Sequence, residues 1–394
     1  MNIAIFSSMF PPIQTGTSFY TYNLAKALAE KSNDVILITA KNNIQNENDE
    51  NLIYPVIRLR AIHFKMKSFF NHLRVCSIFP SNYKTASNSL KKFRPDLILL
   101  VNHYLDISLV AIYCARILQV PLVISIGTQI QSSYCFRNLV LKTLDRLVIG
   151  LFILQFADKI ISWDKEIDRY IKDTYSYNIS KKTKIIHFGY NGDATLYKNH
   201  TLSLNKSNQI LGVGAITQQR PYIFEVKVFK ALLSIYPELN FKIIGNVYNR
   251  EVIRVIKELD LHSKVILTGE KPHSYVLSEM KKSAIHWMML NATYVGLGTA
   301  NIEAMMLGLP VISNIPKDLF GEDNLLEDMV SYIYTDGKDV NKIKNKITLL
   351  LKERYKLELI GKTGKEFAEV NFNWNKIACD FIEFFKEIVI HYKY

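Results

Sequence analysis

Residues 295 to 314 read VGLGTANIEAMMLGLPVISN and carry the clearest structural pattern in the chain. A Gly-Leu-Gly triplet at 296–298 precedes Thr299, where an apolar segment with one acidic residue, Glu303, begins. The segment ends at the Gly-Leu-Pro turn 308–310, and a short β-branched run follows. This order predicts a loop, a helix N-terminus, a helix and a buried strand.

The same stretch has chemistry that suits a ligand site. Glycines let a ligand approach the backbone closely, and the free N–H groups of a first helical turn attract anions such as diphosphate. Glu303 lies about one turn further along, where its carboxylate would accept hydrogen bonds from a sugar diol. An ordinary buried helix and strand with one glutamate at the rim explains these residues equally well.

Short β-branched runs alternate with amphipathic segments along the rest of the chain. The predicted strands are Asn2–Phe6, Asp34–Thr39, Asp96–Val101, Pro121–Ile126, Lys159–Ser162, Lys184–His187, Ile210–Gly214, Asn240–Ile244, Lys264–Thr268, Ala284–Met288 and Pro310–Ser313. Predicted helices between them include Ser18–Glu30, Leu105–Leu118 and Arg137–Phe156. The alternation restarts after a polar stretch, so we expect an α/β protein with two doubly wound, Rossmann-like domains.

Composition is consistent with a soluble protein without disulfides. The chain has 394 residues, of which 48% are hydrophobic and 22% charged. Four scattered cysteines without CxxC spacing predict reduced thiols in a cytosolic protein. The N-terminus has no basic segment of the signal-peptide kind, and the apolar run 147–154 is far shorter than the roughly twenty residues that span a membrane.

The net charge of +13 is unevenly distributed along the sequence. The forty residues from Val56 to Pro95 contain nine basic residues and no acidic one. Such a stretch suits an anionic membrane or a lipid-linked acceptor, but a solvated face or a nucleic-acid surface remains open. The candidate residues for a membrane or acceptor surface are Arg58, Arg60, Lys65, Lys67, Arg74, Lys91 and Lys92.

Several other loops follow predicted strands. They are FPPIQTGT at 10–17, GAITQQR at 214–220, IIGN at 243–246 and LTGEK at 267–271. A GxGxxG fingerprint is missing, which argues against a nicotinamide site. Neither a DxD pair, a GxSxG elbow nor a ligand-spaced His/Cys cluster occurs, so we expect neither a bound metal nor serine hydrolase chemistry.

Taken together, these loops resemble those of the retaining sugar-nucleotide glycosyltransferases of family 4, from Met1 to about Val389. The resemblance implies the GT-B fold, in which two Rossmann-like domains face each other across a cleft. It implies an acceptor domain over residues 1–190, a linker over 191–208 and a nucleotide-sugar domain over 209–374. The last helix, 375–394, is expected to pack back on the first domain.

The resemblance also implies roles for individual residues. Glu303 would hold the donor ribose, and Arg220 would neutralise the diphosphate together with backbone N–H groups near Gly298 and Thr299. Gly16 would let the first domain close over the donor sugar. The implied donor-binding set is Gly16, Gly214, Arg220, Lys271, Gly298, Thr299 and Glu303; no catalytic residue is assigned.

Four positions depart from the family pattern. Thr15 stands for a glycine, Ala215 for an arginine, Gly127 for a histidine and Val295 for the first of two glutamates. His103 follows another predicted strand and is either a partial substitute for the missing histidine or a structural residue. An unusual donor, such as a deoxy or amino sugar, or a loss of activity would explain the departures.

The resemblance predicts a retaining, metal-independent transferase that needs no cofactor and moves a sugar from a nucleotide-sugar donor to a saccharide or lipid-linked acceptor. Bacterial surface polysaccharide synthesis (O-antigen, capsule or lipopolysaccharide) is the expected setting, at the cytoplasmic face of the plasma membrane. The alternatives are a non-catalytic partner subunit of an active transferase and a GT-B epimerase or phosphorylase. A nucleic-acid-binding role fits poorly with two nucleotide-site loops.

Overall fold

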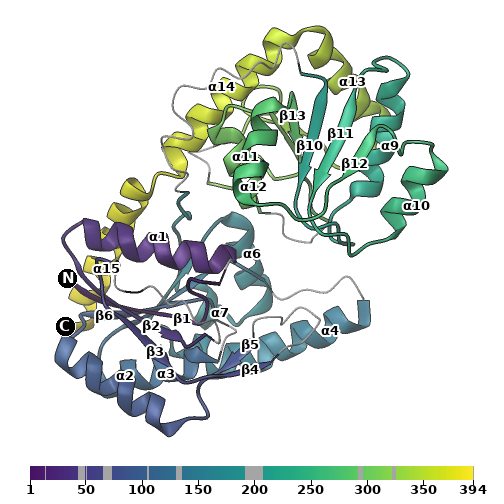
Figure 1. The fold of residues 1–394 in the computed structure, drawn as a ribbon. Helices are drawn as coiled ribbons and strands as arrows, with labels where there is room; N and C mark the ends of the chain where they lie inside the picture. Colours follow the sequence, from purple (N-terminus) through teal and green to yellow (C-terminus); the bar gives the residue numbers. More distant parts are fainter. Residues whose placement is uncertain are drawn as a thin grey trace. The chain divides into compact units, whose positions relative to one another are not determined.

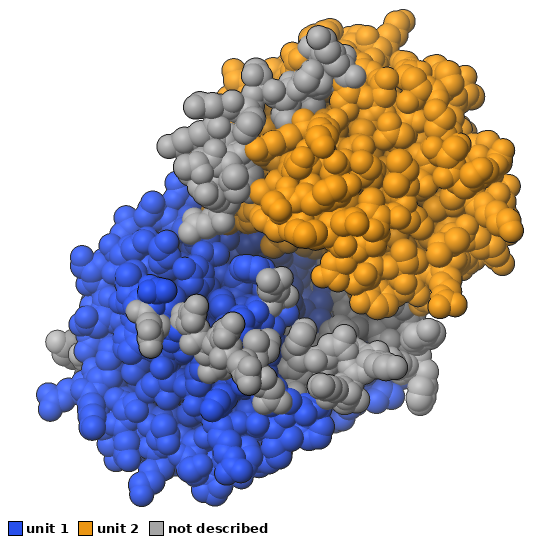
Figure 2. All heavy atoms as spheres, viewed as in Figure 1, with its two compact units in different colours: residues 1–189, 373–394 blue, residues 190–372 orange. Residues whose placement is uncertain are grey.

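The structure is a computed structural model that describes residues 1–13, 15–42, 49, 51–64, 73–103, 106–129, 135–190, 207–291, 296–321 and 325–393. The chain divides into two compact units, coloured separately in Figure 2. Unit 1 comprises Met1–Gly189 and Asn373–Tyr394, and unit 2 comprises Tyr190–Phe372. Most of the linker predicted at 191–208 lies outside the described residues.

Unit 1 is built on a seven-stranded parallel sheet (Figure 1). Its strands, in spatial order, are β3 (Val56–Leu59), β2 (Asp34–Ala40), β1 (Asn2–Ser7), β6 (Leu97–Val101), β7 (Leu122–Ile126), β8 (Lys159–Ser162) and β9 (Thr183–Ile185). A separate antiparallel pair consists of β4 (Ile62–Phe64) and β5 (Leu73–Val75). Every residue of β6 and β7 is buried, as expected for a sheet covered by helices on both faces.

Helices cover the two faces of this sheet. Its helices are α1 (Gly16–Glu30), α2 (Pro80–Phe93), α3 (Ile107–Leu118), α4 (Cys135–Leu144), η1 (Asp145–Ile149), α5 (Gly150–Phe152), η2 (Leu154–Phe156), α6 (Lys165–Thr174), α7 (Tyr177–Ser180) and α15 (Trp374–Lys393). Figure 1 shows α1 on one side of the sheet and α2, α3 and α4 on the other. The C-terminal helix α15 packs against α1, and its aromatic residues Trp374, Phe381 and Phe385 join the core of unit 1.

Unit 2 contains a six-stranded parallel sheet. Its strands, in spatial order, are β12 (Val265–Leu267), β11 (Asn240–Ile244), β10 (Gln209–Val213), β13 (Ile285–Trp287), β14 (Val311–Ser313) and β15 (Ile333–Tyr334). The helices are α9 (Tyr222–Leu233), α10 (Glu251–Glu258), α11 (His273–Lys282), α12 (Thr299–Met306), α13 (Val340–Lys352) and α14 (Arg354–Asn371). Its core is separate from that of unit 1, with the fully buried rings of Phe229, Phe241 and Trp287 at its centre.

Each sheet has a point at which the strand order reverses. In unit 1 the chain runs outward from β1 through β2 and then returns to place β6 on the other side of β1. In unit 2 the same reversal places β13 beside β10, opposite β11. In doubly wound sheets, ligands bind beyond the carboxyl ends of the strands at this reversal. The fold therefore directs attention to the loops after β1 and β6 and to those after β10 and β13.

The predicted fold class, an α/β protein with two Rossmann-like domains, is confirmed. The predicted strands lie within one or two residues of the observed ones, and β8 and β11 match exactly. The sequence does not predict four of the strands, β3, β4, β5 and β15. Strand β3, with the arginine that follows it, reads VIRLR and begins the basic stretch that was interpreted above as a surface. Among the described residues, no helix has the length and apolar run needed to cross a membrane.

Candidate functional site

The glycine loop before α12 is shaped as a close-packed helix start. Gly298 has φ of +76°, and a Cβ atom there would lie 2.7 Å from Cε of Met288. The positive φ favours glycine at this position, whereas the contact is with the end of a flexible methionine side chain, which can shift. Thr299 begins α12 and is exposed, so the free N–H groups of the first turn face solvent or a ligand. Val295 lies outside the described residues.

The carboxylate of Glu303 on α12 is held by two polar side chains of unit 2. The Tyr190 hydroxyl donates a hydrogen bond to Oε1 of Glu303 at 2.8 Å, and Nε2 of His273 lies 3.0 Å from the same oxygen. The Glu303 side chain is 12% exposed, whereas that of His273 is 59% exposed. The hydrogen bond to Glu303 raises the pKa of His273, which favours the imidazolium form and a charged pair.

Two asparagines fix the surroundings of α12. Nδ2 of the buried Asn301 side chain donates to the carbonyl of Leu297 at 2.8 Å on the inner side of the helix. Asn314, just after β14, accepts from the N–H of Leu290 at 3.1 Å and donates to its carbonyl at 2.8 Å. The loops after β13 and β14 are thereby held together, which gives Glu303 a rigid base.

The loop after β10 brings a cation against a glycine. The Arg220 guanidinium lies over Gly214, where a Cβ atom would be 2.5 Å from Cζ of the arginine. Nη1 of Arg220 donates to the carbonyl of Val213 at 3.3 Å. Gly214 has φ of +133°, so its backbone also favours glycine. Ala215 follows with no cation, and this loop therefore presents one positive side chain.

A buried acid lies close to this cation. Glu225 on α9 is 1% exposed, and burial raises its pKa well above the usual range, while the charge of Arg220 opposes that rise. The Tyr222 hydroxyl donates to the carbonyl of Gly214 at 3.3 Å. The first turn of α9 is thus hydrogen-bonded to the glycine loop through Tyr222.

The neighbouring strand β11 approaches the same loop through its backbone. Gly245 has φ of +154°, and a Cβ atom there would lie 2.2 Å from the carbonyl oxygen of Gly214. The N–H of Gly245 donates to the carbonyl of Gly269 at 2.9 Å. Three glycine turns, after β10, β11 and β12, are therefore stacked at one edge of the sheet.

Lys271 lies further along this edge, after β12. It is exposed, and its Nζ lies 5.9 Å from the centroid of the Tyr275 ring. Beside it, Nδ2 of Asn246 donates to Oε2 of Glu270 at 2.6 Å. The structure brings Gly214 and Arg220 into contact and holds Glu303 firmly, but no described contact joins Lys271 to either group.

In unit 1 the loops at the reversal between β1 and β6 are joined by neutral polar groups. Nδ2 of Asn102, after β6, donates to Oγ1 of Thr17 at 2.9 Å. Thr15 caps α1 by accepting from the N–H of Ser18 at 3.2 Å, so the residue that replaces the family glycine serves the helix. At Gly16 a Cβ atom would meet no atom within 4 Å, so open space lies in front of this backbone.

A second group of neutral polar side chains links α1, β7 and the loop after β8. The Tyr20 hydroxyl and Nε1 of Trp163 both lie within hydrogen-bond distance of Oγ of Ser125, at 2.9 and 2.8 Å. At Gly127 a Cβ atom would lie 2.0 Å from the Trp163 ring. The indole therefore occupies the space into which a histidine at position 127 would have to project.

His103 does not stand in for that histidine. It is fully buried, its Nε2 lies 3.1 Å from the Tyr175 hydroxyl, and burial lowers its pKa to about 3. Tyr175 in turn donates to Oδ1 of Asp145 at 2.7 Å. The imidazole is part of an internal network and is neutral, so the structural interpretation of His103 is the one that its surroundings support.

The basic residues proposed as a surface separate into two groups. Arg74 is 5% exposed and donates to the carbonyl of Ser8 at 2.7 Å, and the Arg58 side chain is 9% exposed and pairs with Asp49 at 2.7 Å. The prediction that these two arginines lie on a membrane or acceptor surface is wrong, because both are used inside unit 1. Arg60, Lys91 and Lys92 are exposed, whereas Lys65 and Lys67 lie outside the described residues.

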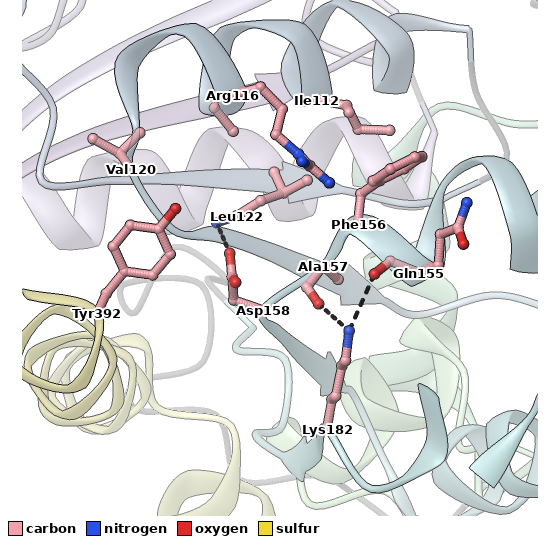
Figure 3. Close-up of a pocket in the computed structure, with 11 residues that line it drawn as sticks. Ile112, Arg116, Val120, Leu122, Gln155, Phe156, Ala157, Asp158, Lys182 and Tyr392 are labelled. Atoms are coloured by element: carbon pink, nitrogen blue, oxygen red, sulfur yellow. Dashed lines mark hydrogen bonds between the residues drawn. The ribbon is translucent and has the colours of Figure 1, made fainter. Parts of the chain in front are cut away.

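A cavity of about 290 Å³ lies elsewhere in unit 1 (Figure 3). Its lining residues Leu122, Asp158 and Lys182 precede or begin β7, β8 and β9, so it opens at the amino ends of these strands. Figure 3 shows the Lys182 ammonium donating to the carbonyls of Gln155 and Ala157, at 3.2 and 2.5 Å. The Lys182 ammonium is already bound to these carbonyls. Nucleotides bind at the carboxyl ends of the strands in doubly wound sheets, whereas this cavity lies at the amino ends, so it is not the donor site.

In the described part of the chain, no group of three or more His, Cys, Asp and Glu side chains is placed to hold a metal ion. The polar groups at the two reversal points are a carboxylate, a guanidinium, amides and hydroxyls. Such groups bind anions and sugar hydroxyls directly.

Comparison with known proteins identifies the family. The glycosyl transferases group 1 family matches residues 193–367, and the Glycosyltransferase Family 4 family matches residues 15–193. The chain belongs to the family-4-like glycosyltransferases. An uncharacterized glycosyltransferase of Methanocaldococcus jannaschii is 24% identical over 245 residues, 61% of this chain. That match spans 63% of the relative, less than two thirds of its length.

Solved structures share the fold across nearly the whole chain. HepE of Anabaena, solved in complex with UDP and glucose, gives a TM-score of 0.67 at 18% identity and covers 98% of this chain and 99% of its own. Sucrose-phosphate synthase of Thermosynechococcus elongatus gives a TM-score of 0.70 at 19% identity, with 99% of each chain covered. Both likenesses confirm the GT-B type of fold, as does the sheet topology.

Four residues of these groups escaped the sequence analysis. Tyr190 and His273 are hydrogen-bonded to Glu303, and Asn314 binds the backbone of Leu290. The Trp163 ring fills the space beside Gly127. Their only signals were positional, because each follows a predicted strand or a glycine loop. A tyrosine or histidine in such a place has many structural uses, so sequence alone did not single them out.

Proposed function

We propose that the chain is a retaining, metal-independent glycosyltransferase that moves a sugar from a UDP-linked donor to a saccharide or lipid-linked acceptor. The observation that carries the proposal is the Glu303 carboxylate, fixed by Tyr190 and His273 one turn inside the helix that follows the glycine loop. Bacterial surface polysaccharide synthesis at the cytoplasmic face of the membrane is the setting we propose.

In this proposal unit 2 holds the donor at the reversal between β10 and β13. The diphosphate lies at the N-terminus of α12, where free N–H groups and the Arg220 guanidinium stabilise the charge that develops on the departing nucleotide. The ribose hydroxyls donate to Glu303, and the exposed His273 imidazole yields its place to them. Lys271 and its loop are assigned to the base, and Gly16 in unit 1 to the donor sugar.

Support for UDP comes from the structural neighbour HepE, which was solved in complexes with this nucleotide. The test is a thermal-shift screen of UDP-, GDP-, dTDP- and CMP-sugars against the purified chain. Stabilisation by one UDP-sugar beyond UDP alone is expected, and it should persist in excess chelator. If no sugar nucleotide stabilises the chain, the proposal is wrong.

A non-catalytic partner subunit is the second candidate, and one observation favours it. The Trp163 ring fills the space beside Gly127 that a histidine side chain would need, so unit 1 lacks room for that group. Under this alternative the chain would bind a sugar nucleotide weakly and transfer nothing. A single-turnover assay with a bound UDP-sugar separates the two candidates, because the partner subunit would release neither UDP nor product.

A further inference from the structure

The helices α4, η1 and α5 of unit 1 form one helical segment with an apolar outer face. Seven large apolar side chains along it are between 41% and 63% exposed: Leu139, Val140, Leu144, Leu147, Val148, Leu151 and Phe152. Most are spaced three or four residues apart, so they lie along one side of the segment. A continuous exposed apolar stripe of this kind marks a surface that a membrane or another protein covers.

The inner side of the segment is locked by a buried acid. Asp145, 1% exposed, accepts hydrogen bonds from the hydroxyls of Tyr170 and Tyr175. The N–H of Gly150 donates to the carbonyl of Asp145, five residues earlier, in a π-type turn. A Cβ atom at Gly150 would lie 3.3 Å from the Tyr175 ring. Asp145 and Gly150 therefore both lie on the inner side of the segment. This attachment fixes which side of the segment points outward.

The adjoining helix α3 continues the apolar surface. Leu109, Tyr113 and Ile117, four residues apart, are between 40% and 49% exposed. The Arg116 guanidinium lies 4.9 Å from the Phe156 ring centroid, which ties α3 to η2, the short helix that follows α5. On its other side α3 packs against α2, and the Tyr83 and Tyr113 rings lie 5.1 Å apart. The three helical elements therefore form one layer on the same side of the sheet (Figure 1).

Charge on this layer has a single sign. The helices α2 and α3 contain no acidic residue, and the one in the α4–α5 segment, Asp145, is buried. The cations with described side chains on the layer are Lys84, Lys91, Lys92, Arg116, Lys142 and Arg146, and all but the half-buried Lys142 are exposed. Apolar side chains flanked by cations, without exposed carboxylates, match an anionic lipid surface in both polarity and charge.

We propose that the α2–α3–α4–α5 layer docks unit 1 on an anionic bilayer, with the α4–α5 segment lying in the headgroup region and inserting its apolar stripe. None of these helices is long and apolar enough to cross, so the segment lies in the plane of the membrane. The inference rests on the proposed function in one respect, because a bilayer is where a lipid-linked acceptor would be met. It replaces Arg58 and Arg74 as the basis for membrane contact.

The test is flotation of the full chain with phosphatidylcholine vesicles that contain or lack phosphatidylglycerol. Binding is expected to vesicles with the anionic lipid and to weaken as salt is raised. The double variant Leu147→Ser/Leu151→Ser should reduce the partition coefficient at least tenfold. Its matched control, Leu359→Ser/Val370→Ser, removes similarly exposed residues from α14 in unit 2 and should bind as the unmodified chain does.

Charge and insertion are tested separately. The variant Lys91→Gln/Lys92→Gln/Arg146→Gln should lower binding at low salt at least tenfold and flatten the salt dependence, whereas Lys257→Gln/Lys362→Gln/Lys386→Gln should not. A tryptophan placed at the stripe, Leu151→Trp, should shift its emission to the blue on addition of anionic vesicles, and Leu359→Trp should not. The three native tryptophans are buried and give a constant background.

Three results would overturn the proposal. They are failure of the chain to float with anionic vesicles, wild-type flotation of the Leu147/Leu151 variant, and self-association of the chain in solution that this variant abolishes. The last would assign the stripe to a second copy of the chain. Thermal shift with UDP-sugars in lipid-free buffer is run on every variant, because a chain that floats but binds no sugar nucleotide contradicts the proposed function alone.

Discussion

Unit 1 and unit 2 use the same edge of a doubly wound sheet and line it with different chemistry. In unit 2 the edge holds ionic groups, the Glu303 carboxylate with its His273 partner and the Arg220 guanidinium, around glycine turns whose backbones touch. In unit 1 the loops at this edge are joined by hydroxyls, an amide and an indole, as in the Asn102–Thr17 hydrogen bond. The cations that reach the loop after β1, Arg58 and Arg74, have mostly buried side chains and donate to the backbone carbonyls of Pro11 and Ser8. The strand topology alone therefore does not decide what such an edge binds.

The difference has a physical consequence for ligands. A diphosphate needs cations and free N–H groups, and a ribose diol needs an acceptor with a fixed position; unit 2 offers all three. A sugar or glycan carries hydroxyls without charge, and the neutral groups of unit 1 match these. Variants in both units test that division.

Gly245→Ala tests whether backbone contact builds the edge of unit 2. The added methyl group would lie 2.2 Å from the Gly214 carbonyl oxygen at a φ of +154°, so we expect a loss of about 3 kcal/mol in the free energy of unfolding. Urea denaturation followed by circular dichroism measures it. Gly269→Ala is the matched control: its φ is +70° but its Cβ would meet no atom within 4 Å, and about 1 kcal/mol is expected. Equal losses would show that the Gly214 contact has no special weight.

Glu303→Ala tests the ionic character of the same edge. Because the ribose hydroxyls would lose their acceptor, we expect the dissociation constant for a UDP-sugar to rise at least tenfold. This corresponds to a loss of about 1.4 kcal/mol in binding free energy. Titration calorimetry measures the change. Glu258→Ala, at the exposed end of α10, removes an equal charge from unit 2 and should leave the affinity unchanged. Unaltered binding by Glu303→Ala would remove this residue from the donor site.

Gly16→Ala tests whether a sugar occupies the open space beside α1 in unit 1. Open space in front of Gly16 and its place at the start of α1 mean that alanine should leave the free energy of unfolding within about 1 kcal/mol of the original value or raise it. If a sugar occupies that space, the rate of transfer should fall about tenfold while UDP still binds. A variant with full activity would show that no substrate approaches Gly16.

Much of this fold was predictable, and the reasons are local. Strands β8 and β11 are bounded by clear changes in hydrophobicity, and the loop–helix–strand pattern at 295–314 has glycines where the backbone requires them, as at Gly298. The burial of Arg58 and Arg74 was not predictable, because each donates to a backbone carbonyl distant in sequence. Arg58 donates to the carbonyl of Pro11, 47 residues away, and Arg74 to that of Ser8, 66 residues away. The same holds for Tyr190, which lies 113 residues from Glu303.

The smallest expected effect concerns the pKa of His273 in its pair with Glu303. The pKa of His273 is raised above its ordinary value of 6.5 by its hydrogen bond to Glu303, so the pair stabilises unit 2 fully below that pH and less as pH rises through the raised value. Proton NMR of the imidazole should show the raised pKa. Glu303→Gln should lower it towards 6.5, and Lys271→Gln, which removes a nearby exposed charge, should not.

Addition of UDP decides whether ribose takes the place of the imidazole. If Glu303 turns to the ribose, His273 loses its partner, its pKa falls, and the complex binds fewer protons than the free chain. Affinity for UDP should then increase about twofold to threefold as pH rises from about 6 to 8, by linkage. An affinity that instead falls over this range would mean that the imidazolium stays in place and binds the diphosphate itself. Unit 2 would then use a second cation, which the replacement of arginine by Ala215 had seemed to remove.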